Sequence, residues 1–206
     1  GGPTVASMNI VSGNSDFGIV LSGSLNKVQR NYIGLASNGF TKLGNGTGIS
    51  VTGSTHLIGG SGTGNFISGN DHEGIYGQDV SLTMIQSNLI GTDNNGTAPV
   101  GNGGIGVRIF NATGLLIGGP SATHRNIVCA NGTGGIAIGG ATSSGNVISG
   151  NYVGVDATGT FKYGNTFGIS LTGSGNRVGG SNAGEGNVVS GNTNDGIALL
   201  DAVNTK

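Results

Sequence analysis

The sequence is poor in the residues that carry much protein chemistry: it has one cysteine, no tryptophan, three prolines and only 8% charged residues. Cys129 alone cannot form a disulfide within the chain, and a single thiol provides neither a thiolate metal site nor a redox pair. We therefore expect Cys129 to be a small buried or half-buried residue. The chain instead has 46 glycines among 206 residues, far above the globular average, which is typical of a repeat protein.

Charge and long apolar runs are also lacking. The formal net charge is -1 and there is no run of lysine or arginine, so the electrostatic attraction on which nucleic-acid binding depends is weak. No apolar stretch exceeds a few residues, which excludes a membrane-spanning helix. The start, Gly-Gly-Pro-Thr, has neither an initiator methionine nor a signal peptide. We expect a mature form or a piece of a longer protein, with no nucleic-acid partner.

What the sequence does contain is an internal repeat. A Gly-Ile pair recurs about every 30 residues, with its isoleucine at Ile19, Ile49, Ile75, Ile105, Ile136, Ile169 and Ile197. A first apolar column precedes these pairs at Val11, Ile33, Ile67, Ile90, Val128, Val153 and Val189, and another follows at Val28, Ile58, Ile85, Ile117, Ile148 and Val178. These short β-branched segments, separated by glycine, asparagine and serine, predict strands. Three strands per coil, stacked at about 4.8 Å, give about seven coils.

One column fixes the expected register. An asparagine stands two residues before every member of the first apolar column, at Asn9, Asn31, Asn65, Asn88, Asn126, Asn151 and Asn187. The asparagine amide both donates and accepts and tolerates bends, so stacked copies can bond to one another and to the turn backbone. The pattern predicts a structural asparagine ladder along the stack. The alternative is a turn preference without stacking.

The motifs "NxIxGN" and "GIxLxG" resemble those of the parallel β-helix repeat family, which has a right-handed, pectin-lyase-like solenoid fold and includes bacterial surface proteins. The resemblance covers essentially the whole chain. It implies an all-β, right-handed parallel β-helix that forms a single domain over residues 1–206. It implies little about activity, because lyases, hydrolases, adhesins and surface proteins share this fold.

A longer period lies over the coils. Long segments follow the first strand only in alternate coils, at residues 34–47, 91–104 and 154–167, and are here called the fins. The true repeat is therefore predicted to be a two-coil unit of about 60 residues, with alternating long loops. The fins should project from one side of the rod, and loops on a rigid scaffold are where binding usually occurs.

Neither end of the sequence resembles a cap. "GGPTVASM" leads into the first coil, and "LLDAVNTK" follows closely on Ile197 without an amphipathic helix. An uncapped solenoid exposes strand edges and its core. We expect that a longer protein continues with more coils, or alternatively that identical units stack end to end into a filament, an association that need not close.

Polar residues in the corner between the first and second strands form the candidate site. Asp71, His72 and Glu73 are adjacent, and Asp93 and Asp156 lie in fins of the same corner. Asp71, His72 and Glu73 are weak catalytic candidates for acid and base chemistry, and Asp71, Glu73 and Asp93 are weak Ca²⁺ ligand candidates. We favour the alternative that these are solvated turn residues, because aspartate favours turns and successive short corners lie about 10 Å apart.

Enzymes of this fold offer a further comparison. Pectate lyases have a carboxylate-lined calcium site with a catalytic arginine, and polygalacturonases have Asn-Thr-Asp, Asp-Asp, Gly-His-Gly and Arg-x-Lys motifs. The nearest approach here is "NTND" at Asn192, and the other three polygalacturonase motifs are missing. The resemblance therefore supplies no catalytic residue and no cofactor. The absence of tryptophan also argues against a long sugar-binding cleft.

A better indication of binding is the residue between each ladder asparagine and its inward aliphatic, which strand alternation places on the outer face. All seven are apolar or aromatic: Ile10, Tyr32, Phe66, Leu89, Ile127, Tyr152 and Val188. A monomer rarely exposes such a stripe, so something should cover it. Either fin residues fold back over it (Leu35, Phe40, Leu43, Val100, Phe161 and Tyr163), or another rod or a saccharide lies on it. The candidate binding residues are Tyr32, Phe66, Tyr152, Asp93 and Asp156.

The outer face of the second strand is less regular. Its outward residues are expected to be Val20, Ser50, Tyr76, Ala137, Ser170 and Ala198. A flat ice-binding surface would need a regular threonine array, which this series does not provide. Taken together, the sequence predicts an extracellular or cell-surface structural or adhesive rod that contacts carbohydrate or self-associates. The alternative is a polysaccharide-active lyase or hydrolase.

Overall fold

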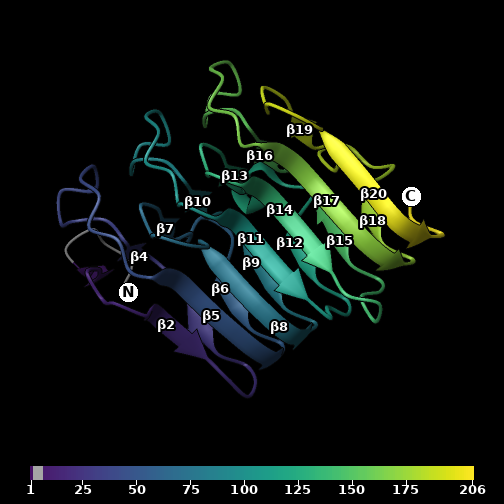
Figure 1. The fold of residues 1–206 in the computed structure, drawn as a ribbon, viewed down its shortest axis with the longest axis horizontal. Coiled ribbons are helices and arrows are strands. Elements are labelled where there is room, and N and C mark those ends of the chain that lie inside the picture. Colours follow the sequence, from purple (N-terminus) through teal and green to yellow (C-terminus); the bar gives the residue numbers. More distant parts are fainter. Residues whose placement is uncertain (2–6) are drawn as a thin grey trace.

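The computed structural model describes residue 1 and residues 7–206, with the backbone alone at residues 201 and 202. Over this part, the chain winds through three parallel sheets that stack into an all-β solenoid of about six turns. Figure 1 shows the strands side by side in the order of the sequence, from the N-terminal turn to the C-terminal turn. No helix in the described residues is long and apolar enough to cross a membrane.

Every turn contributes strands in the same order. The first sheet contains β1 (Asn9–Val11), β4 (Asn31–Ile33), β7 (Phe66–Ile67), β10 (Leu89–Ile90), β13 (Ile127–Val128), β16 (Tyr152–Val153) and β19 (Val188–Val189). The second contains β2 (Phe17–Leu21), β5 (Thr47–Ser54), β8 (Ile75–Ser81), β11 (Ile105–Phe110), β14 (Gly134–Gly139), β17 (Phe167–Ser174) and β20 (Ile197–Val203). The third contains β3 (Lys27–Val28), β6 (Leu57–Gly59), β9 (Met84–Gln86), β12 (Leu116–Gly118), β15 (Val147–Ser149) and β18 (Arg177–Val178).

The strand register confirms two of the three predicted apolar columns and corrects the other. Val11 pairs with Ile33 in the first sheet, Val28 pairs with Ile58 in the third, and the same columns continue to Val189 and Val178. In the second sheet, however, it is Val107 that pairs with both Ile75 and Ile136. Ile105 instead pairs with Gly134, two residues earlier in the strand. The Gly-Ile pair at Ile105 was therefore the wrong repeat unit, and Gly106-Val107 is the right one.

The interior is a continuous stack of β-branched side chains. The central members of the three columns are fully buried, including Ile33, Ile49, Ile58 and Ile117. Each turn exposes its inner face until its neighbours cover it, so the apolar burial that stabilises a turn, about 1.5–3 kcal/mol per side chain, depends on stacking.

The corner between the second and third sheets requires a left-handed backbone in every turn. The residue at this point has a φ between 48° and 65° in six successive turns: Leu25, Thr55, Leu82, Gly114, Gly145 and Gly175. Glycine adopts this conformation readily, whereas leucine and threonine do so only under constraint. Leu25 and Leu82 are also largely exposed, so burial does not compensate for their conformation.

The three fins leave the first sheet after β4, β10 and β16, which confirms the alternation of long and short corners. Each fin is a narrow hairpin closed by an antiparallel bridge, Leu35 to Lys42, Thr92 to Pro99 and Val155 to Lys162. In Figure 1 they project as a row along one edge of the solenoid. The expectation about an N-terminal cap falls largely on residues 2–6, outside the described part of the chain.

Candidate functional site

The seven predicted ladder asparagines form one unbroken hydrogen-bonded series. The Nδ2 atom of each donates to Oδ1 of the next over 2.8 to 3.1 Å, from Asn9 to Asn187. The five inner members are buried. Asn65 also donates from Nδ2 to the Val28 carbonyl, and its Oδ1 accepts from the Asn31 backbone N–H. From Asn31 to Asn187, each amide thus bonds to backbone groups as well as to its neighbours in the ladder.

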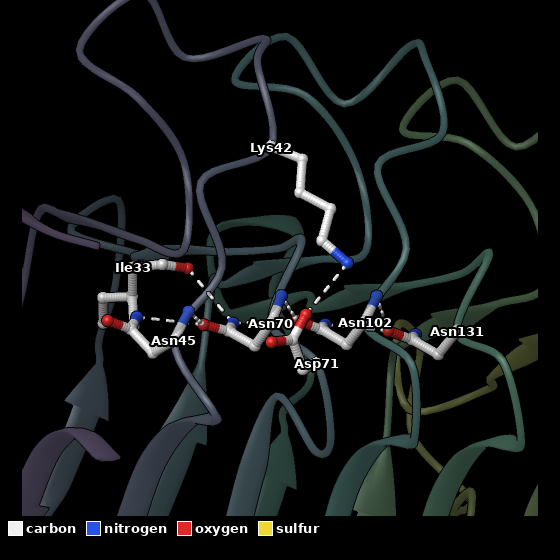
Figure 2. Close-up of polar contacts among 7 residues, drawn as sticks. All are labelled: Ile33, Lys42, Asn45, Asn70, Asp71, Asn102 and Asn131. Atoms are coloured by element: carbon white, nitrogen blue, oxygen red, sulfur yellow. Dashed lines mark hydrogen bonds and ion pairs between the residues drawn. The ribbon is translucent and has the colours of Figure 1, made fainter. Parts of the chain in front are cut away.

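A second ladder of seven asparagines runs along the other end of the first sheet. Its members are Asn14, Asn45, Asn70, Asn102, Asn131, Asn165 and Asn192, and the Nδ2-to-Oδ1 distances are 2.7 to 3.1 Å. Figure 2 shows four of them in a row, with Asn70 also donating to the Ile33 carbonyl. Sequence reasoning missed this ladder. Its signal is an asparagine shortly before each second strand, but the fins vary its distance from the first ladder.

The acidic triplet lies beside this second ladder and does not converge on one point. Asp71 pairs with Lys42, which reaches down from the first fin with its Nζ atom 3.2 Å from Oδ1 (Figure 2). Glu73 pairs instead with Arg108 of the next turn over 3.1 Å. The His72 side chain is exposed, while its backbone N–H donates to Gly46. Each carboxylate therefore holds a cation that joins neighbouring parts of the rod.

The remaining calcium candidate, Asp93, is buried inside its fin. Its Oδ1 atom accepts from the backbone N–H groups of Thr97 and Ala98 at 2.8 and 3.1 Å. Asp93 thus closes the turn at the fin tip. Among the described residues, no group of three or more histidine, cysteine, aspartate or glutamate side chains is close enough to hold a metal ion.

Asp156 has the same role in the third fin. Its carboxylate accepts from the backbone N–H groups of Thr160 and Phe161 and from the Thr158 hydroxyl. Burial acts to raise the pKa of Asp156, but the hydrogen bond from Phe161 together with those from Thr158 and Thr160 outweighs burial and lowers that pKa. Asp156 therefore stays ionised as a structural acceptor.

The apolar stripe on the outer face of the first sheet is covered in its middle and open at its ends. Tyr32 and Ile127 are buried, whereas Ile10 and Val188 at the two ends are exposed. Tyr32 lies edge to face against Phe66 with ring centroids 5.0 Å apart, and its hydroxyl accepts from Asn94 of the second fin over 3.0 Å. The candidate binding residue Tyr152 is half-buried under the guanidinium of Arg125, 4.0 Å from its ring.

Glycines at the fin tips lie against the stripe: an added Cβ would lie 3.5 Å from Leu89 at Gly96 and 2.9 Å from Tyr152 at Gly159. Asn94 donates from its backbone to Gly39 of the preceding fin, and Ala157 donates likewise to Gly96. Gly96 has a φ of 74°, and a Cβ there would lie 2.6 Å from the Ala157 Cβ, so glycine allows the fins to stack. Of the six side chains expected to fold back, Leu35 is buried, Val100 and Tyr163 are half-buried, and Phe40, Leu43 and Phe161 are exposed.

The second sheet carries a polar and aromatic group that sequence reasoning missed. The Arg108 guanidinium lies 4.9 Å from the Phe110 ring centroid while it pairs with Glu73, and Phe110 also meets Tyr76 at 6.4 Å. Arg108 belongs to the outward series, because it pairs with Tyr76 and Ala137. The misplaced register at Ile105 had hidden Arg108 from that series.

The chain finds no match in comparisons with protein-family models, curated proteins and solved structures.

Proposed function

We propose that this chain is a rigid structural rod of an extracellular or cell-surface protein, and that it presents its fins for adhesion. The observation that carries the proposal is the pair of continuous asparagine ladders, which join every turn of the rod to the next. Buried, satisfied amide networks rigidify a fold. The extracellular location is supported by the resemblance of the repeat to bacterial surface β-helices.

The adhesive part of the proposal rests on the fins. Phe40 is 50% exposed and Phe161 is 63% exposed, although both stand on hairpins fixed by backbone hydrogen bonds between neighbouring fins. Exposed aromatic side chains on a pre-ordered surface bind with little loss of conformational entropy. A surface polysaccharide is the proposed partner, because aromatic faces stack on the C–H faces of sugar rings.

A polysaccharide-cleaving enzyme is the alternative. It would need a general acid and a second carboxylate facing one groove. In the described structure, Asp71 and Glu73 instead pair with Lys42 and Arg108, and Asp93 and Asp156 close fin turns. These contacts give every one of the four carboxylates a structural role and favour the rod over the enzyme.

The test is a glycan array with a parallel polysaccharide-cleavage panel, run on wild type and on the double variant Phe40→Ser, Phe161→Ser. We expect binding to at least one cell-surface polysaccharide, at least tenfold weaker in the double variant, and no shortening of the polymer. Lack of binding across the array would overturn the adhesive role. Cleavage that disappears in His72→Ala or Asp71→Asn would establish the enzyme instead.

End-to-end or lateral self-association of the rod stays a separate prediction. Light scattering over a concentration series tests it, because a mass that rises with concentration indicates stacking and a constant monomer mass excludes it.

A further inference from the structure

A pocket of about 290 Å³ opens on the outer face of the first sheet, below the tip of the second fin. Its apolar lining is formed by Met8, Phe66 and Leu89, and its polar lining includes Arg30, Ser87 and Asn94. Gly62, in the loop that precedes β7, also lines the pocket. The volume is close to the lower limit of about 300 Å³ for small-molecule sites.

Arg30 brings an uncompensated positive charge to this pocket. Its Nη2 atom donates to the Gly62 carbonyl over 2.9 Å, but its Nε atom is buried without a hydrogen-bond acceptor among the described residues. The described residues form three ion pairs, those of Lys42, Arg108 and Arg177, and Arg30 belongs to none of them. Guanidinium is always charged in proteins. Arg125 is half-buried too and likewise belongs to none of these pairs, so the buried, unpaired Nε atom is what distinguishes Arg30.

Asn94, which also lines the pocket, has a second unpaired atom. Its Nδ2 atom donates to the Tyr32 hydroxyl over 3.0 Å, while Oδ1 is buried without a partner in the described structure. Because a phenol can donate as well as accept, a rotated amide would keep its bond to Tyr32 and turn Nδ2 to the pocket instead. In both orientations one polar atom of Asn94 is left without a partner among the described residues.

The rod contains an internal control for this arrangement. Arg125 precedes the ladder residue Asn126 as Arg30 precedes Asn31. Arg125, however, donates from Nε to the Gly150 carbonyl over 3.2 Å and lies 4.0 Å from the Tyr152 ring. The fold can therefore satisfy an arginine at this position by itself. At Arg30 it leaves the Nε atom unpaired and a pocket beside the equivalent aromatic residue, Phe66.

From these contacts we propose that the pocket binds a small organic acid. The carboxylate pairs with the Arg30 guanidinium, which matches a carboxylate in bidentate geometry. The body of the ligand lies against Phe66 and Leu89, and a hydroxyl group on it, able to donate or accept, bonds to Asn94. An aromatic hydroxy acid and a sugar acid both carry a carboxylate and a hydroxyl group of this kind. The proposed site does not depend on the adhesive role of the fins.

The proposal is tested by titration calorimetry and two-dimensional NMR with four probes: 4-hydroxybenzoate, benzoate, the neutral 4-hydroxybenzamide, and glucuronate. We expect saturable binding of 4-hydroxybenzoate or glucuronate, and at least tenfold weaker binding of the neutral amide. Whichever of the two acids binds more tightly identifies the class of ligand, an aromatic hydroxy acid or a sugar acid. Benzoate should bind less tightly than 4-hydroxybenzoate because it lacks the group for Asn94. Failure of both hydroxy acids to bind wild type would overturn the proposal.

Variants separate the site from general surface binding. Arg30→Gln should weaken the tighter probe at least tenfold, whereas the matched control Arg125→Gln should leave its affinity within twofold. Equal weakening in both variants, or none in Arg30→Gln, would contradict the site. If Arg30→Gln fails to fold, NMR shifts in wild type decide: changes centred on Phe66, Ser87 and Leu89 support the pocket, and changes elsewhere overturn it.

Discussion

Asn70 donates from Nδ2 to Oδ1 of Asn102 over 2.8 Å, which joins two turns whose first strands are β7 and β10. The Oδ1 atom of Asn70 itself accepts from both the backbone N–H and the Nδ2 of Asn45. All three side chains are buried. One amide thus connects three successive turns, and its removal leaves buried donors and acceptors unpaired on both sides.

Replacement of a ladder asparagine should therefore destabilise the rod. We expect Asn70→Ala, and likewise Asn65→Ala in the first ladder, to lower the free energy of unfolding by about 1–3 kcal/mol, the cost of unpaired buried polar groups. Urea denaturation measures the change. Asn95→Ala is the control, since Asn95 is exposed and should shift stability by no more than about 0.5 kcal/mol. A ladder variant as stable as wild type would contradict the structural role.

Leu82→Gly should stabilise the protein. Leu82 has a φ of 48° and is 63% exposed, and a left-handed conformation costs an L-residue about 1–2 kcal/mol. Glycine removes this strain but orders a more flexible chain, so the expected net gain in unfolding free energy is about 0.5–1 kcal/mol. Thermal and urea denaturation measure it. Leu82→Ala keeps the strain and should show no gain; equal gains in the two variants would refute the explanation.

The Asp156 carboxylate should make the third fin sensitive to acid. Its pKa is lowered in the folded state, so its stabilising effect is present above the unfolded pKa of about 4 and is lost as pH falls through the folded pKa. Asp156→Asn should therefore reduce the loss of stability between pH 7 and pH 2. Urea denaturation at the two pH values measures this. Asp195→Asn, at an exposed carboxylate, is the comparison, and the same effect in both would contradict the prediction.

The Cys129 thiol should be inert in the native protein. Burial, and then the charges of Asp156 and Asp93, raise its pKa to about 12, so almost no thiolate forms near neutral pH. We expect iodoacetamide to label Cys129 at pH 8 only after denaturation. Rapid labelling of the folded protein would show that the thiol is accessible.

The same thiol gives a prediction at alkaline pH. The folded state keeps its proton up to about pH 12, whereas an unfolded cysteine loses it near pH 8.5, so stability is full below that pH and falls above it. Wild type should lose about 1.4 kcal/mol per pH unit more than Cys129→Ala between these values. Urea denaturation at pH 8 and pH 10.5 compares them, and parallel curves would refute the assignment.

Much of the candidate site could not be predicted, for reasons visible in particular residues. Asp93 and Asp156 look like surface carboxylates in the sequence, but short backbone loops fold around them and bury them. The outward position of Arg108 could not be predicted, because its strand contains both a Gly-Ile and a Gly-Val pair. Only the pairing with the neighbouring strand shows which of the two pairs is in register. The Arg30 pocket depends on the fin tip at Asn94, which is distant in the sequence.

The sequence by itself determined the solenoid, the two confirmed strand columns and the alternation of the fins. These features recur at a regular spacing along the sequence. A periodic apolar pattern is buried only when each turn stacks on an equivalent turn. Tertiary structure alone decided the register of the second ladder, the stacking of one fin on the next, and the difference in hydrogen bonding between Arg30 and Arg125. Those depend on contacts between neighbouring turns, and variable loop lengths break the relation between sequence spacing and spatial position.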